Sequence, residues 1–141
     1  MIGIVDYGSG NIHAIATIYK NLNLNHKIIS NPEDLNKVEK IILPGVGAFD
    51  STMQQLIDSG FRDKLNELVL LKKIPILGIC VGLQVMGSGS EEGKMRGLDW
   101  IPGKVKKFDI DSINDNPKLP HMGWNTLSNL RNHPLFMGLD A

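Results

Sequence analysis

The sequence lacks several features that would place a protein in a class at once. Its 141 residues include a single cysteine, so no disulfide can form within the chain, which is typical of a reducing compartment. Lysine plus arginine (15) balances aspartate plus glutamate (15), so no net charge favours nucleic acid or an anionic membrane as partner. The longest apolar run, residues 74–87, falls short of the roughly 20 residues that span a bilayer. No signal peptide is visible, and we therefore expect a cytoplasmic protein that enters no membrane.

What is present is an alternation of short β-type runs with helical patterns. Strand-like runs lie at 2–6, 26–30, 40–44 and 74–79, and helical signals begin at Asn11 and at "NPED" and continue over 51–58 and 62–71. This order predicts an α/β fold, a mostly parallel open sheet with helices on both faces. Residues 103–110 and 120–127 alternate like two further half-exposed strands. The length predicts one domain over residues 1–141.

Glycine-rich loops follow three of the expected strands: "DYGSGN", "PGVGAF" and "GICVG". Ligands of open parallel sheets bind beyond the carboxyl ends of the strands, so these loops are the candidate site. The first loop lacks the third glycine of the dinucleotide fingerprint, because His13 stands in its place, and we exclude that function. The four histidines have no metal-ligand spacing, so we expect neither a metal site nor a cofactor.

Residues 78–82, Gly-Ile-Cys-Val-Gly, have the spacing of a nucleophile elbow with cysteine in place of serine. So tight a turn from strand to helix leaves no room for side chains two residues before and after the nucleophile. It would place Cys80 at a helix N-terminus, which lowers a thiol pKa, and leave the Val81 N–H free to bind an oxyanion. The glycines of residues 44–47 would supply a second donor. The alternative is that Cys80 is a small buried core residue.

Five ordered motifs resemble one protein family. "GICVGLQ" followed by "SEEG" is similar to the class I glutamine amidotransferases, and "MIGIVDYGSGNIHAI", "ILPGVGAFD", "GLDWIPGKVKKF" and "LPHMGWN" narrow the resemblance to the glutaminase subunits of imidazole glycerol phosphate synthase. The resemblance implies that the cysteine attacks the side-chain amide of glutamine, forms a thioester and releases ammonia. It also implies a heterodimer in which a (β/α)8 cyclase subunit uses the ammonia to make imidazole glycerol phosphate in histidine biosynthesis.

The same resemblance assigns roles to individual residues. The catalytic set would be the nucleophile and the oxyanion hole: Cys80, Val81, Val46 and Gly47. The glutamine-binding set would be Gly45, Gly47, Gln84 and Glu92, although a solvated surface charge is the alternative for the glutamate. The residues expected to face the cyclase are Asn11, His121, Met122, Trp124 and Asn125, with a buried core position as the alternative for the tryptophan. Residues 44–47 would also be the switch that keeps the glutaminase nearly silent until the cyclase binds its ligand.

The chain departs from the family in one respect. No F-H-P-E-like segment supplies the histidine and glutamate of the triad, since "NHPLF" has Leu135 in the place of the glutamate. We interpret the chain as a piece of a longer protein, or a truncated gene product, whose last strands are missing; the intact motifs favour the first. We expect the parent protein to be a glutaminase and residues 1–141 alone to be inactive. Two other functions stay open: a paralogous glutaminase for amination of a surface-polysaccharide sugar, and a non-catalytic activator of a cyclase-like partner.

Overall fold

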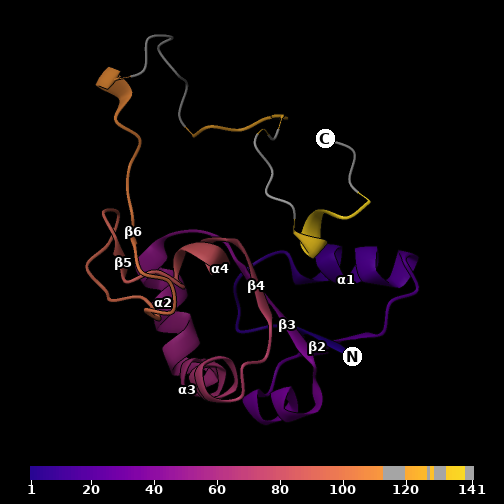
Figure 1. The fold of residues 1–141 in the computed structure, drawn as a ribbon. Helices are drawn as coiled ribbons and strands as arrows, with labels where there is room; N and C mark the ends of the chain where they lie inside the picture. Colours follow the sequence, from indigo (N-terminus) through magenta and orange to yellow (C-terminus); the bar gives the residue numbers. More distant parts are fainter. Residues whose placement is uncertain (113–119, 127, 129–132, 139–141) are drawn as a thin grey trace. The chain divides into compact units, whose positions relative to one another are not determined.

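Four parallel strands form the central sheet of the computed structural model (Figure 1). They are β1 (Ile2–Val5), β2 (His26–Ile29), β3 (Lys40–Gly45) and β4 (Ile76–Cys80), in the order β2-β1-β3-β4. The structure describes residues 1–112, 120–126, 128 and 133–138. The chain falls into two units, Met1–Lys107 and Phe108–Ala141, and each is described by itself. The sheet and its helices belong to the first unit.

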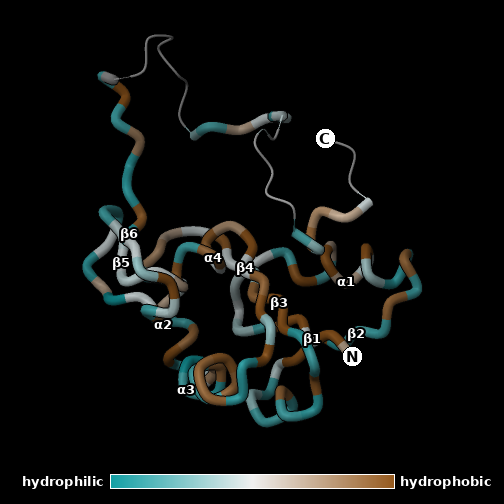
Figure 2. Tube along the Cα trace, viewed as in Figure 1, coloured by the Kyte–Doolittle hydropathy of each residue, from teal (hydrophilic) through white to brown (hydrophobic). Residues whose placement is uncertain are grey.

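Side chains of the strands alternate between the two faces of the sheet, and each face has its own core. On one face Ile4 and Ile42 pack against Ile12 of α1 (Ile12–Asn21). On the other face Val5 and Leu43 belong to a larger cluster with α2 (Phe49–Asp58) and α3 (Phe61–Asn66). Figure 2 shows the hydrophobic stretches of β1 and β3 gathered between these helices. The expected two-sided α/β sheet is therefore confirmed.

Most helices begin where the sequence predicts them. Asn11 caps α1, its side-chain oxygen accepting the N–H of Ala14 at 3.3 Å. The "NPED" segment forms a 3-10 helix, Pro32–Lys37, rather than an α-helix, and Asn31 caps it by accepting the N–H of Glu33. After α3 the chain continues as a π-helical turn, Glu67–Leu71. No described helix is both long and apolar enough to cross a membrane.

Beyond β4 come α4 (Val81–Gln84) and a small parallel pair, β5 (Gly89–Ser90) and β6 (Lys104–Val105). The predicted strand over 103–110 is wrong outside β6, since the N–H of Lys107 bonds the Glu91 carboxylate at 2.9 Å instead of a neighbouring strand. The predicted strand over 120–127 is also wrong for residues 120–126, and residue 127 lies outside the described residues. Alternating polarity predicts exposure, but a strand needs a partner to pair with.

Candidate active site

Cys80 is the last residue of β4, and its backbone has φ +56° and ψ −120°. Few non-glycine residues adopt such a conformation, which costs about 1–3 kcal/mol and is found mainly at functional sites. The residue is exposed. The alternative reading of Cys80 as a buried core residue is therefore wrong, and the thiol is presented on a strained turn between a strand and a helix.

Three glycines allow α4 to pack directly on the sheet. A Cβ on Gly78 would lie 2.5 Å from the Leu83 Cα, and one on Gly82 would overlap the carbonyl oxygen of Leu43. A Cβ on Gly45 would lie 2.9 Å from the carbonyl carbon of Val81. Because real Cβ atoms almost never approach other atoms within 3.0 Å, no larger residue fits these positions without a shift of the backbone. The glycine spacing that predicts the elbow thus has the expected physical cause.

The pairing of β3 with β4 places the "PGVG" loop beside the nucleophile. Gly45 is the register partner of Cys80. The two loops and the start of α1 line one apolar cavity of about 270 Å³, whose walls are Gly10, Asn11, Ala14, Ile15, Ile18, Pro44, Gly45, Val46, Ile79 and Cys80. The exposed thiol, the candidate oxyanion loop and the predicted partner-facing Asn11 therefore meet at one end of the sheet.

The candidate oxyanion donors differ in whether their backbone N–H already has an acceptor. Val81 is the first residue of α4, a position whose N–H has no acceptor within its own helix. The N–H of Val46 instead donates to the Ser9 hydroxyl at 3.0 Å, so it is already engaged. Gly47 has φ +93° with no atom within 4 Å of a Cβ position, so the loop has free space around it. The helix that begins at Val81 is a single turn, so its dipole is small.

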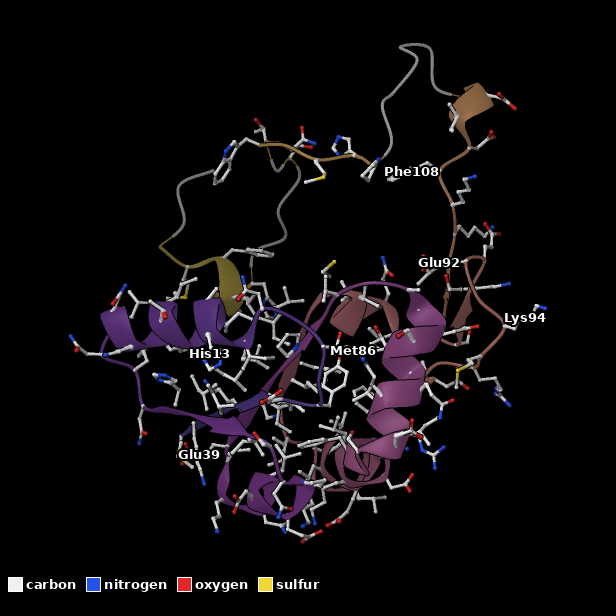
Figure 3. The ribbon with its side chains drawn as sticks, turned by 180° about the vertical axis from the view of Figure 1, so that it is seen from behind. His13, Glu39, Met86, Glu92, Lys94 and Phe108 are labelled. Carbon is white, nitrogen blue, oxygen red and sulfur yellow. The ribbon has the colours of Figure 1, made fainter. Side chains whose placement is uncertain are left out.

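The predicted glutamine-binding side chains meet in a second cavity. Gln84 and Glu92 line a pocket of about 550 Å³ together with Ser90, Glu91, Val105, Lys106 and Lys107. Cys80 does not line this pocket, although α4 joins it directly to Gln84. The Glu92 carboxylate accepts the N–H of Phe49 at 3.2 Å, at the start of α2 (Figure 3). Glu92 is thus held by a helix end as well as facing the pocket.

Asp50 fixes the segment that carries Glu92, a role that the sequence did not reveal. Its carboxylate accepts the N–H of Lys94 with both oxygens, at 2.9 and 3.1 Å, and that of Met95 at 3.0 Å. These backbone hydrogen bonds lower the pKa of Asp50 below its ordinary value. The only local signal was an acidic residue in the first turn of α2. Its partners lie more than forty residues away and could not be inferred from spacing.

The "YGSG" loop after β1 packs on the end of β3. The Tyr7 hydroxyl donates to the Pro44 carbonyl oxygen at 2.5 Å, and burial raises the pKa of Tyr7 to about 12. A Cβ on Gly10, which has φ +97°, would lie 2.6 Å from the Pro44 Cβ. The loop that does not fit a dinucleotide therefore supports the strand end beside the nucleophile.

The other predicted partner-facing residues lie in the second unit. His121, Met122, Trp124 and Asn125 occupy a described segment without helix or strand, and the tryptophan is fully exposed. The core alternative for Trp124 is therefore wrong. Among the described residues no imidazole hydrogen-bonds the Cys80 thiol; His26 and His133, for example, bond local backbone groups. No triad base is assembled within the described part of the chain.

Comparison with known proteins supplies the family. The sequence model of the family "Glutamine amidotransferase class-I" matches residues 3–141. Imidazole glycerol phosphate synthase subunit HisH of Leptospira interrogans is 49% identical over 140 residues, covering 99% of this chain and 69% of the relative. The HisH subunit of Bdellovibrio bacteriovorus is 46% identical over 141 residues, again covering 69% of the relative. In Campylobacter jejuni, HisH 1 is 44% identical over 141 residues.

A solved structure agrees on the fold. A crystal structure of a glutamine amidotransferase superposes with a TM-score of 0.63 at 18% identity, covering 79% of this chain and 61% of that one. Identity this low shows the fold alone, whereas the HisH relatives match almost the whole chain. The chain therefore belongs to the class-I glutamine amidotransferases and, among them, to the HisH subunits of imidazole glycerol phosphate synthase.

Proposed function

We propose that Cys80 is the nucleophile of a glutaminase reaction. Its sulfur attacks the side-chain amide carbon of glutamine, and the oxygen of the resulting tetrahedral intermediate is held by backbone N–H groups of Val81 and of the 45–47 loop. The proton that the Cys80 thiol gives up as it attacks is passed by a base to the –NH2 group, so that ammonia leaves when the C–N bond breaks. Water then adds to the thioester, which releases glutamate and restores the thiol. The observation that carries this proposal is the strained, exposed Cys80 in register with Gly45.

Substrate recognition is assigned to the larger cavity. The Glu92 carboxylate suits the ammonium group of glutamine, and the Gln84 amide can bond its polar groups; both line the same pocket. Productive binding must connect this pocket with the cavity that contains Cys80. The shared element is α4, which begins directly after the nucleophile and carries Gln84. We therefore expect the bound substrate to extend along α4.

The partner belongs to the same proposal. We expect a (β/α)8 cyclase subunit that receives the ammonia and forms two products, imidazole glycerol phosphate and an aminoimidazole carboxamide nucleotide. Asn11, which lines the Cys80 cavity, and the exposed Trp124 are the proposed contacts. Trp124→Ala should weaken binding of the cyclase, measured by calorimetry, whereas Leu71→Ala, which changes another exposed side chain, should not. A free nucleophilic thiol also suits the reducing cytoplasm in which we place the protein.

The nucleophile is tested by covalent labelling. A diazo-ketone analogue of glutamine, added with the cyclase and its ligand present, should place one adduct on Cys80, detected by mass spectrometry. Cys80→Ala should give none, and competition with glutamine should slow labelling in the parent chain. If iodoacetamide modifies Cys80 and the glutamine analogue does not, the protein is a non-catalytic activator instead.

Turnover is a separate expectation. Because the sequence has no F-H-P-E-like segment to supply the triad histidine and glutamate, we expect the 141-residue chain to produce no glutamate above background, even with the cyclase and its ligand. Glutamate release at a normal enzymatic rate would contradict this. Complementation of a histidine auxotroph by a version extended with the triad residues would distinguish the histidine pathway from amination of a polysaccharide sugar.

A further inference from the structure

The segment 97–101 is bound to the residues directly after α4 through consecutive backbone hydrogen bonds. All five of its N–H groups donate to carbonyl oxygens of residues 85–88, at distances of 2.7 to 3.1 Å. Gly97 lets the two backbones approach this closely, because a Cβ there would overlap the carbonyl oxygen of Gly87. The chain that leaves α4 is therefore held by a segment that follows β5 in the sequence.

A helix as short as α4 does not fix its own position. Its four residues, Val81–Gln84, form a single turn, and an isolated turn of helix is unstable in water. Its N-terminal half is fixed by Gly82, which lies against the backbone of β3. Its C-terminal end depends on the 97–101 segment. The direction of α4, and with it the placement of Gln84 relative to Cys80, is therefore set from both ends.

Trp100 anchors the 97–101 segment to α3. Its indole N–H donates to the side-chain oxygen of Asn66, the last residue of α3, at 2.8 Å. The ring is half-buried and packs against the larger core cluster, to which Leu98 of the same segment belongs. Because a buried donor that loses its acceptor is costly, the bond to Asn66 fixes how the segment sits on α3.

We propose that Trp100 is a positioning residue for the nucleophile: its bond to Asn66 fixes the 97–101 segment, and this segment fixes α4, the helix that joins Cys80 to Gln84. Each link is a direct one, by a side-chain hydrogen bond, by backbone hydrogen bonds and by the covalent chain. The substrate is expected to extend along α4, so a small change in the helix direction misaligns the thiol with the bound amide. The inference rests on the proposed glutaminase function, since it assigns a further residue to that same site.

The first experiment measures the hold on α4 without any turnover. Hydrogen-exchange NMR on the 141-residue chain follows the indole N–H of Trp100 and the backbone amide of Val85, which bonds back into α4. Both should exchange about tenfold faster in Asn66→Ala than in the parent, as expected for the net loss of one hydrogen bond. Asn66→Asp keeps an acceptor oxygen and should restore slow exchange. Asn36→Ala, which removes a surface hydrogen bond of the 3-10 helix, is the matched control.

Two outcomes of this measurement overturn the proposal. One is unchanged exchange of the Val85 amide in Asn66→Ala, because the bond would then not hold α4. The other is equally faster exchange of amides throughout β1 and β3, because that would mean a general loss of stability. Faster exchange confined to α4 and the 97–101 segment, and reversed by aspartate, supports it.

The second experiment tests the consequence for the nucleophile. With the cyclase and its ligand present, Asn66→Ala and Trp100→Phe should react with the diazo-ketone analogue of glutamine at a limiting rate several-fold lower than the parent, with iodoacetamide labelling of Cys80 unchanged. Asn66→Asp should restore the rate. A bond that served stability alone would lower the free energy of unfolding in urea, but it would not change the labelling rate of molecules that remain folded.

Equal limiting rates in Asn66→Ala and the parent overturn the assignment. So does an equal fall in iodoacetamide labelling, because the thiol itself, rather than its alignment with the substrate, would then have changed. If the parent chain does not react with the analogue under any condition, the proposed glutaminase function fails, whereas the exchange measurement still decides whether Trp100 holds α4.

Discussion

Tyr7 is a buried phenol whose ionisation the fold opposes. It lies between the end of β1 and the end of β3, where its hydroxyl donates to Pro44 at 2.5 Å. Burial raises its pKa from 10.0 to about 12, and the neighbouring Ser9 hydroxyl lowers the pKa but is the smaller cause. A donor that stays protonated over the physiological range gives the neighbouring loop a constant support. One residue of the site can therefore be tested through the pH dependence of stability.

Stability should fall at high pH because of Tyr7. Its pKa is higher in the folded chain than in the unfolded chain, so its contribution is complete below pH 10 and is lost as the pH rises to about 12. The loss should amount to roughly 2–3 kcal/mol of unfolding free energy, at 1.4 kcal/mol per pKa unit. Urea unfolding of the parent and Tyr7→Phe between pH 9 and 11.5 measures it, with Tyr19→Phe as control. If the free energy of unfolding falls with pH equally steeply in the parent and in Tyr7→Phe, the prediction is wrong.

At the scale of elements, the contact of α4 with β3 depends on backbone lying against backbone. Gly82 is buried, and a Cβ there would overlap the Leu43 carbonyl and lie 2.9 Å from the Pro44 carbonyl carbon. Both neighbours belong to a central strand of the sheet and cannot move cheaply. The helix that follows the nucleophile can therefore lie this close to β3 only because residue 82 has no side chain.

Gly82→Ala should destabilise the protein by about 3 kcal/mol, the upper part of the range for overpacked cores. The measurement is the free energy of unfolding in urea, with Gly103→Ala as the matched control. Gly103 has an ordinary φ and no atom within 4 Å of its Cβ position, so its substitution should change stability by less than about 0.5 kcal/mol. Equal values for the two variants would show that α4 can shift away from β3.

The elements that could be predicted are those whose signal is local. The runs at 2–6 and 40–44 place β1 and β3 within a residue or two, and Asn11 marks the start of α1. The strand expected over 103–110 and the unrecognised β5 show the opposite case, because strand formation there depends on which segment lies alongside. In the candidate site, too, the features with a local sequence signal could be predicted and those that join distant residues could not. The glycine spacing predicts the elbow, whereas the clamp at Asp50 and the bond from Ser9 join residues far apart in the chain.

The clamp between α2 and the 91–95 segment is a second test at this scale. Asp50→Asn should weaken the bonds to the Lys94 and Met95 amides, because an amide oxygen accepts less strongly than a carboxylate. Trypsin should then cleave the native chain after Lys94 several-fold faster. Asp58→Asn is the control, since Asp58 lies at the other end of α2 and accepts a hydrogen bond from the Gln54 side chain. Because the segment carries Glu92, labelling of Cys80 by the glutamine analogue should also need more reagent in Asp50→Asn.

At the scale of the whole molecule, the two faces of the sheet are covered unequally. α1 packs over β1 and β2, while Leu77 and Ile79 of β4 stay 48% and 39% exposed. Within the described residues β4 pairs with β3 alone, so it forms one edge of the sheet. An apolar strand at an open edge is a surface on which other chains pair or associate. The same edge carries the nucleophile at its end.

We expect the 141-residue chain to associate through this surface. Light scattering coupled to gel filtration should show a mass that rises with concentration in the parent and less so in Leu77→Lys, because a charge on an exposed edge opposes association. Leu71→Lys is the matched control: Leu71 is 77% exposed, more than Leu77, but it ends the π-helical turn after α3 and lies outside the sheet. Equal suppression by both variants would mean that added charge, rather than the edge, keeps chains apart. A monomeric parent at high concentration would mean that the β4 edge does not drive association.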